Sequence, residues 1–376
     1  MRAPPAAVLW CLLLAASCRS DTSSAPRPPG ASATGSLSIS ADPILSLSPQ
    51  DSSGAPLLGN LADATRLSSG LIAVVDRDIQ AVLILDSAGQ LVLQAGRRGQ
   101  GPGEYEAVRG IGQCAPDTLF VWDVSNQRMS VLDAQGTFIR SFALPMAPVA
   151  GYCAEAAEFI VWERFLNSTA PGADQPPVRG VANLISAAGE RVGSLGELQA
   201  GENRPLGAVT QFAPAVNGIW VGTSDTTVIR LLARDGRELG SVSAGEGHRA
   251  PSAAEYDAAI AALAATVPGT VDQMAEMRAF LRKRFPPPRY VPAYRALLTN
   301  GNGVLFVVTS PLGLGTTDLS VFDASGASLG TLTLPGDVEV VEVGEQYLLG
   351  ITDDENGNAR VVQHGLDIRM EYVSPL

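Results

Sequence analysis

Histidine is scarce in this chain of 376 residues, which contains only His248 and His364. Two distant histidines do not form the imidazole cluster that zinc-dependent lyases require. The sequence also lacks a Gly-x-Ser-x-Gly nucleophile motif and a Gly-Lys-Ser/Thr phosphate-binding loop. No catalytic residue, metal ligand or cofactor can therefore be assigned from sequence motifs, and a function other than catalysis is favoured.

Positive charge is also scarce, because Lys283 is the only lysine and the formal net charge is −12 at pH 7. Proteins that bind nucleic acids neutralise phosphates with clustered lysine and arginine. The acidic composition therefore argues against a nucleic-acid partner. Long hydrophobic runs are missing too, because the apolar run over residues 6–16 is shorter than the roughly 20 residues that span a bilayer and no later run is long enough.

The N-terminus has the order of a secretory signal, with Arg2, the apolar run and the small residue Ser17 in succession. Because Cys18 follows small residues, the segment resembles a lipobox, in which cleavage before the cysteine leaves a diacylated N-terminal residue. The resemblance implies lipidation of Cys18. Lipoboxes usually carry leucine three residues before the cysteine, and Ala15 stands there in this chain, so an ordinary signal peptide is the alternative.

The segment after this cysteine is dense in Ser, Pro, Ala and Thr, a composition that favours disorder. We expect residues 1–17 to be a signal peptide, residues 18–36 a lipidated, disordered tether and residues 37–376 the folded domain. Arg19 rather than Asp follows the cysteine, and by resemblance to bacterial sorting rules this favours the outer membrane. The expected location is an outer-membrane lipoprotein that faces the periplasm or the extracellular side.

A repeated strand pattern fills the remainder of the chain. In its clearest copy an apolar strand ends in Asp123, a polar turn follows, a second strand ends in Asp133, and Gly136 closes a tight turn into a third strand. The same pattern occurs earlier with Asp76 and Gly89, and 13 residues separate the first acid from the glycine in both copies. The pattern predicts consecutive antiparallel strands.

The turn glycine can be followed through the chain at six positions, namely Gly89, Gly136, Gly189, Gly236, Gly326 and Gly365. The intervals are 47, 53, 47, 90 and 39 residues, and four-stranded propeller blades recur at about 40 to 50 residues. The long intervals contain insertions, a Pro- and Gly-rich loop at 167–177 and a segment with helical spacing at about 251–289. We therefore predict an all-β fold, a six-bladed β-propeller with a helical hairpin insertion.

The insertion carries its own helix signals. Ser252 with Glu255, and Thr270 with Gln273, are spaced as capping boxes, which predicts helices over residues 253–266 and 271–284. A helical hairpin across one mouth of the propeller is the simplest placement. A basic cluster ends the second helix and is either a solvated helix end or an anion-binding site; it comprises Arg278, Arg282, Lys283, Arg284 and Arg289.

The repeat at residues 119–136 resembles an NHL repeat, in which an acid ends one strand, Asn and Arg occupy the turn, a second acid ends the next strand and a glycine turns the chain. These residues are Asp123, Asn126, Arg128, Asp133 and Gly136. The glycine-rich segment 96–105 resembles the loop that joins successive NHL-type blades. The resemblance implies a six-bladed propeller like those of bacterial NHL-like lipoproteins, and it implies no particular ligand.

Two cysteines, Cys114 and Cys153, lie outside the N-terminal segment. They precede the second strand of neighbouring repeat units, so neighbouring blades would present them at equivalent places near the channel. An oxidising compartment favours a disulfide between them. Two buried free thiols are the alternative, because equivalent positions on adjacent blades can lie beyond the reach of a disulfide.

The glycine-rich loop also provides the candidate binding surface, which comprises Arg97, Arg98, Glu104, Tyr105 and Arg109. Binding groups concentrate on loops that a rigid scaffold carries. We expect this surface at the propeller mouth that the helical insertion covers. The alternative is a structural turn between blades, with Glu104 and the arginines paired among themselves.

We interpret the chain as an envelope-anchored binding or scaffolding module. The expected partner is an envelope protein or a small ligand, the expected membrane contact is the lipid anchor alone, and the expected state is a monomer. Two alternatives stay open. One is a metal-dependent lactonase or hydrolase-type propeller with carboxylates in its channel, and the other is a purely structural envelope protein.

Overall fold

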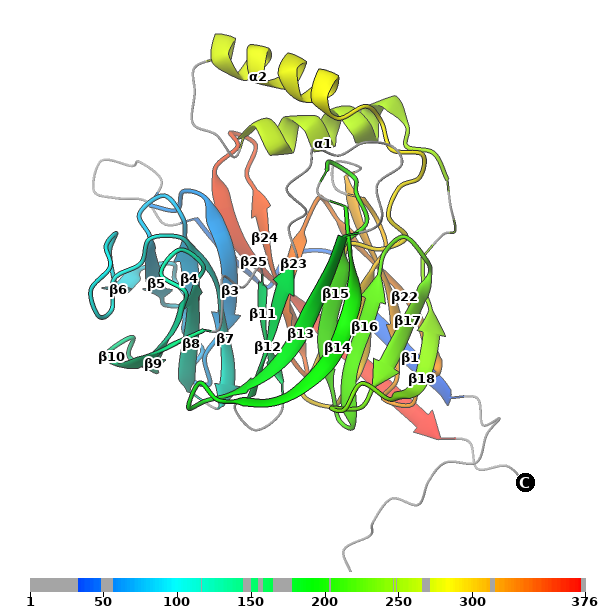
Figure 1. Cartoon of the computed structure of the whole chain (residues 1–376), viewed down its shortest axis with the longest axis horizontal. Coiled ribbons are helices and arrows are strands. Elements are labelled where there is room, and N and C mark those ends of the chain that lie inside the picture. The colour runs from blue at the N-terminus through cyan, green and yellow to red at the C-terminus, as the bar shows by residue number, and fades with distance from the viewer. Residues whose placement is uncertain are drawn as a thin grey trace, which may run out of the picture.

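The computed structural model describes residues 33–48, 57–115, 117–144, 150–154, 158–164, 178–202, 204–245, 247, 249–265, 271–311 and 315–372. Over these ranges the strands form six antiparallel sheets, and the innermost strands of successive sheets contact one another in a closed ring. The fold is a six-bladed β-propeller, as the sequence predicted (Figure 1).

Each blade contributes one strand to the channel wall and stacks the others outward. From the channel outward, blade 1 consists of β3 (Leu61–Arg66), β4 (Ile72–Asp76), β5 (Ala81–Leu85) and β6 (Leu91–Ala95), and blade 2 consists of β7 (Val108–Ala115), β8 (Thr118–Asp123), β9 (Arg128–Asp133) and β10 (Phe138–Ala143). In the same order, blade 3 consists of β11 (Ala150–Ala154), β12 (Glu158–Arg164), β13 (Val178–Ser186) and β14 (Arg191–Gly201), and blade 4 consists of β15 (Thr210–Ala215), β16 (Gly218–Thr223), β17 (Val228–Leu232) and β18 (Glu238–Ser243). Blade 5 consists of β19 (Ala296–Thr299), β20 (Leu305–Val308), β21 (Thr316–Phe322) and β22 (Ser328–Pro335), and blade 6 consists of β23 (Glu339–Val343), β24 (Tyr347–Asp353), β25 (Ala359–Tyr372) and β1 (Ala33–Ile39), with β2 (Leu45–Leu47) also paired with β25.

The middle strands are apolar because neighbouring blades cover both of their faces. Every residue of β4 and β5 is buried. A strand that is buried on both faces has a continuous apolar run instead of an alternating pattern. The side chains of adjacent blades form shared clusters; one of them joins Val75 and Ile84 of blade 1 to Leu119 and Val121 of blade 2.

The predicted turn glycines join the third and fourth strands of five blades. They have left-handed φ angles of 78°, 77°, 88°, 83° and 86° at Gly89, Gly136, Gly189, Gly236 and Gly326, a conformation that glycine adopts without steric cost. The prediction for Gly365 was wrong, because this residue lies inside β25 and pairs with Tyr347. Blade 6 has no such turn, since its outer strand comes from the opposite end of the sequence.

That outer strand is β1, which pairs antiparallel with β25 from Ala33 opposite Tyr372 to Ile39 opposite Leu366. The first strand of the chain therefore closes the ring. It begins before the predicted domain boundary at residue 37, so the last residues assigned to the tether belong to the blade. The predicted signal peptide and Cys18 lie outside the described residues.

The insertion folds into the two predicted helices, α1 (Ala253–Ala265) and α2 (Val271–Arg284). The first capping box is formed, with the Ser252 N–H 2.8 Å from a Glu255 oxygen and the Glu255 N–H 3.2 Å from the Ser252 hydroxyl. Thr270 of the second box lies outside the described residues. The hairpin covers one end of the propeller (Figure 1), and none of the helices that the structure describes is long and apolar enough to cross a membrane.

Candidate functional site

The glycine-rich loop between β6 and β7 is fixed by the acid that ends β8. Asp123 is fully buried, and its carboxylate accepts the N–H groups of Glu106 at 2.7 Å and Ala107 at 3.1 Å. The side-chain amide of Asn126 donates to the same carboxylate at 2.8 Å and to the Gly99 carbonyl at 3.0 Å. These contacts between side chains of blade 2 and the loop backbone hold the loop against blade 2.

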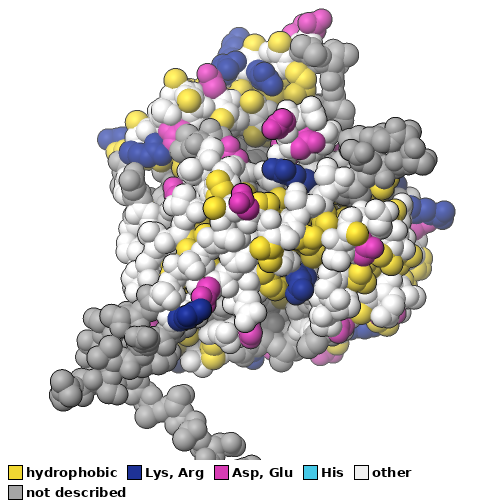
Figure 2. All heavy atoms as spheres, turned by 180° about the vertical axis from the view of Figure 1, so that it is seen from behind, with side chains coloured by type: hydrophobic (Ala, Val, Ile, Leu, Met, Phe, Trp, Pro, Cys, Tyr) yellow, Lys and Arg dark blue, Asp and Glu magenta, His cyan; other side chains and the backbone are white. Residues whose placement is uncertain are grey.

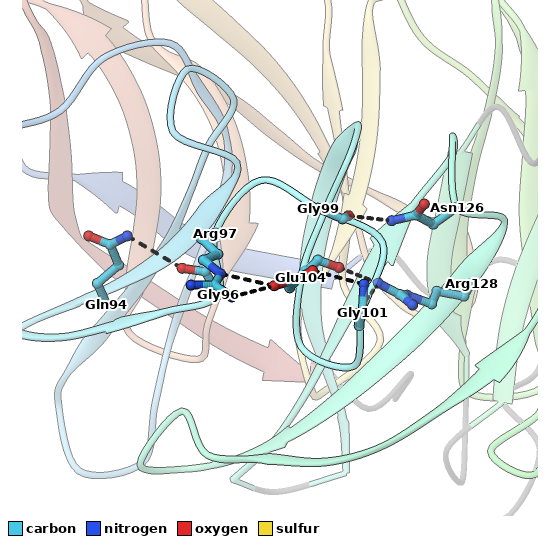
Figure 3. Close-up of polar contacts among 8 residues, drawn as sticks. All are labelled: Gln94, Gly96, Arg97, Gly99, Gly101, Glu104, Asn126 and Arg128. Carbon is cyan, nitrogen blue, oxygen red and sulfur yellow. Dashed lines mark hydrogen bonds and ion pairs between the residues drawn. The ribbon is translucent and has the colours of Figure 1, made fainter.

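Arg128 completes this attachment from the next strand. Its guanidinium donates to the loop carbonyls of Gly101 at 2.7 Å and of Glu104 (Figure 3). It also donates to a third loop carbonyl, that of Gln100, at 2.9 Å. The Glu104 side chain forms an ion pair with Arg97 at 2.8 Å and accepts the Gly101 N–H at 2.9 Å. The acid, Asn and Arg of the repeat therefore have a structural role, and Glu104 and Arg97 pair with each other.

Tyr105 was expected to contact a partner, and this expectation was wrong. The side chain is completely buried in the cluster between blades 1 and 2. Its ring lies against Gly96, where a Cβ atom would stand 2.4 Å from the tyrosine Cε2. A tyrosine between two blades is unavailable to a ligand, and Gly96 is needed because no side chain fits beside the ring.

The other predicted binding residues do not form one surface. Arg98 is an exposed residue of the loop, whereas Arg109 lies at the start of β7 on the wall of the channel. The loop and the helical hairpin both lead from the outer strand of one blade to the inner strand of the next, so they lie on the same face of the propeller. The channel and the space under the hairpin are therefore the remaining candidates on this face.

The channel is a cavity of about 1590 Å³ with both apolar and charged residues in its lining. Its charged lining is concentrated on blades 1, 2 and 6 and comprises Asp63, Arg66, Arg77, Arg109, Glu339, Glu342 and Glu345. Burial raises the pKa of Asp63 to about 8, against the hydrogen bonds that its carboxylate accepts from the N–H groups of Ile111 and Ala64. Burial likewise raises the pKa of Glu342, which accepts hydrogen bonds from the hydroxyls of Thr65 and Tyr347.

Among the residues that the structure describes, no three His, Cys, Asp or Glu side chains gather closely enough to hold a metal ion. His364 is a buried residue of β25, and its Nδ1 lies 2.8 Å from the Ser40 carbonyl oxygen. It thus ties the C-terminal strand to the segment that follows β1. His248 lies outside the described residues.

Cys114 and Cys153 are joined by a disulfide between the inner strands β7 and β11, with 5.1 Å between their Cα atoms. Cys153 lines the channel. The bond connects blades 2 and 3 at the channel wall, the place where the sequence put both cysteines.

The basic cluster at the end of α2 is partly neutralised. Arg282 pairs with Asp257 of α1 at 2.8 Å, and the guanidinium groups of Arg284 and Arg289 lie over the rings of the residues that follow them, at 5.5 Å and 5.0 Å from the centroids. Figure 2 shows Lys and Arg side chains over the helical end of the molecule. The cluster is a solvated surface, and none of its residues lines the channel or the second cavity, which is described next.

A second cavity, the roofed pocket, lies between α1 and the propeller and has a volume of about 540 Å³. Its roof is the alanine face of α1, formed by Ala258, Ala259 and Ala262. Its floor comes from blades 5 and 6 and from the segment that leads into β19. Glu339 lines both this pocket and the channel, so the two cavities meet at the same mouth.

Among the described residues that line the roofed pocket, Arg295 is the only basic one. Its Nε donates to the Ser310 carbonyl at 3.0 Å and one terminal nitrogen donates to the Val338 carbonyl at 2.7 Å. Burial lowers the pKa of Arg295, and the charges of Glu339 and Asp337 oppose this. Sequence reasoning missed this residue, because it stands between the helical segment and β19 with no motif around it.

No family model matches the sequence, and no curated protein matches it significantly. Among solved structures, a candidate exported protein from Bacteroides fragilis NCTC 9343 is similar with a TM-score of 0.52 and 12% identity, over 89% of this chain and 95% of that chain. A member of the DUF4221 family from Bacteroides vulgatus ATCC 8482 is similar with a TM-score of 0.50 and 12% identity, over 89% of this chain and 99% of that chain. At this identity the likeness concerns the fold alone.

Proposed function

We propose that the chain is a ligand-binding module of the bacterial cell envelope, and that it holds its ligand in the roofed pocket. The observation that carries the proposal is the pocket itself. Ligand-binding cavities measure about 300 to 1000 Å³ and combine apolar walls with a few polar groups. The roofed pocket has this size, alanine and other apolar residues on its walls, and one guanidinium at its floor.

The way the pocket is built supports this use. Its floor belongs to a closed ring of sheets, whereas its roof belongs to a hairpin inserted between two blades. The hairpin has a small core in which Tyr256, Ile260 and Leu281 are buried, and Leu206 of the segment before β15 packs against it. The alanine side chains of α1 leave the neighbouring space open.

We also propose that the protein is exported and attached to the outer membrane through Cys18, as a lipoprotein of the NHL-like type. The network of Asp123, Asn126 and Arg128 supports the NHL resemblance, because all three side chains serve the loop between blades. That the similar Bacteroides fragilis protein is a candidate exported protein agrees with export.

The position of β1 indicates how a lipid anchor would orient the propeller relative to the membrane. The start of β1 pairs with the end of β25, and these two strand ends lie away from the two helices (Figure 1). A lipid tether attached to β1 would thus hold the roofed pocket away from the membrane surface, where a ligand from the aqueous compartment has access.

The test is a pull-down from detergent-solubilised envelopes with the full chain and two variants. Ala259→Trp places an indole inside the roofed pocket, and Ala279→Trp places one on an exposed position of α2. We expect wild type and Ala279→Trp to recover the same envelope component and Ala259→Trp to lose it, while all three retain similar melting temperatures. Equal recovery by Ala259→Trp would refute the assignment of the pocket.

A further inference from the structure

We propose that the roofed pocket binds a small zwitterion with an apolar side chain, the chemistry shared by apolar amino acids and short peptides. This inference rests on the proposed function, because it names the ligand class of the same pocket. Three independent features of the lining carry it: a guanidinium held in place at the floor, carboxylates on one side, and apolar walls.

The guanidinium of Arg295 is positioned to receive a carboxylate. Its hydrogen bonds to the carbonyls of Ser310 and Val338 fix the group but do not neutralise its charge. Among the described residues no carboxylate lies within ion-pair distance of it, and its second terminal nitrogen has no acceptor. A half-buried guanidinium with a free edge is the arrangement that binds carboxylates best, because the planar fork matches the two oxygens.

Three carboxylates line the same pocket, those of Asp337, Glu339 and Asp353. A ligand with a carboxylate alone would meet their repulsion, and a ligand with an amine alone would meet Arg295. A zwitterion can pair with both kinds of charge, with its carboxylate on Arg295 and its ammonium group toward Glu339. The side chain of Glu339 is exposed and lies at the mouth of the cavity. Charge complementarity of this kind provides specificity against ligands of one sign.

Most of the remaining lining is apolar and fits a side chain of modest size. The apolar residues include Leu206, Val209, Ala258, Ala259, Pro292 and Ile351, and the polar residues Tyr294, Thr309, Ser310 and Thr352 also line the pocket. Burial of an aliphatic side chain against these residues removes apolar surface from water and so favours binding. The preferred ligand therefore carries a branched aliphatic or aromatic side chain instead of a polar one.

The experiment is a calorimetric titration of the purified full chain with four probes: L-leucine, leucyl-leucine, leucinamide and N-acetyl-leucine. Leucinamide lacks the carboxylate and N-acetyl-leucine lacks the ammonium group. We expect at least one of the two zwitterions to bind, and we expect leucinamide and N-acetyl-leucine each to bind at least tenfold more weakly than the tighter zwitterion. The tighter of leucine and leucyl-leucine identifies the source as free amino acid or peptide. The analogues test the Arg295 contact without a substitution that would release two buried carbonyls.

Two substitutions locate the binding. Glu339→Gln should weaken the zwitterion at least fivefold, and Ala259→Trp should abolish binding. The control is Glu345→Gln, an exposed acid of the same blade at the other end of β23, which should bind as wild type. The proposed ligand class is wrong if neither zwitterion gives a heat of binding, or if N-acetyl-leucine binds as tightly as the zwitterions. If the pull-down still depends on Ala259, the binding module itself survives that result; if it does not, both proposals fail.

Discussion

The acids of the repeat act on backbone N–H groups at the ends of strands. Asp76 accepts the N–H groups of Gly59 and Asp78, as Asp123 accepts those of Glu106 and Ala107. In both blades the side chain joins the second strand to the segment that enters the blade. A repeated Asp in this pattern therefore signals a loop anchor, and a binding role does not follow from its recurrence.

Removal of Arg128 tests this structural role. Arg128→Ala deletes the donors to three loop carbonyls, and the loss of hydrogen bonds with unsatisfied acceptors costs about 1 to 3 kcal/mol. We expect a matching decrease in the free energy of unfolding, measured by urea denaturation. The control is Arg97→Ala, which removes a mostly exposed ion pair and should cost less than about 1 kcal/mol. Equal costs would contradict the anchoring role.

Glu255 should make the hairpin sensitive to acid. Its side chain is 3% exposed and pairs with Arg249, and the hydrogen bonds from this arginine lower the pKa of Glu255 to about 2. Because the folded pKa is below the unfolded value of about 4.3, the stabilisation is complete above the unfolded pKa. It is lost as the pH falls from about 4.5 toward 2.

The measurement is the unfolding free energy of wild type and Glu255→Gln at pH 7 and pH 3. The variant should be less stable by about 2 to 3 kcal/mol at pH 7, and the difference should shrink at pH 3. A difference that is independent of pH would show that the carboxylate charge contributes nothing. Glu276→Gln on the exposed face of α2 is the matched control.

At the scale of elements, the sequence predicts features that depend on neighbouring residues, such as helix starts, but not features that depend on contacts between distant parts of the chain. The first helix begins where Ser252 and the acid three residues later predict, because capping depends on neighbours in sequence. Gly365 was misassigned because its blade receives β1 from the other end of the chain. Tyr105 was misassigned because burial between two blades leaves no mark on the local pattern. Arg295 was missed because the contact between the helical insertion and the propeller that places it in a pocket has no local sequence motif.

The disulfide between β7 and β11 should stabilise the folded chain. It closes a loop of 39 residues, for which the loop-entropy model gives about 3 to 4 kcal/mol. Reduction and the double variant Cys114→Ser/Cys153→Ser should lower the unfolding midpoint to the same extent. Intact-mass analysis after alkylation without reductant is the check, and two labelled thiols on this pair would contradict the bond.

At the scale of the whole molecule, the proposed lipid anchor at Cys18 predicts where the protein resides. If Cys18 is acylated, Cys18→Ser should move the protein from the membrane to the soluble periplasmic fraction. Each buried methylene of the acyl chains contributes about 0.8 kcal/mol to membrane binding. Fractionation of cells that express either form is the measurement, and Cys11→Ser in the signal segment is the control. Unchanged fractionation would contradict the lipoprotein proposal.

The pairing of β1 with β25 also determines when the molecule can fold. Its partners come from opposite ends of the chain, Ala33 and Tyr372, so blade 6 stays incomplete until the last strand has left the ribosome and, if exported, the membrane. Contacts between such distant segments form slowly because a very large loop must close first. Until then β1 has no partner strand, and once β25 is present its edge stays exposed until β1 pairs with it. Ring closure is therefore expected to be a late step in the folding of this chain.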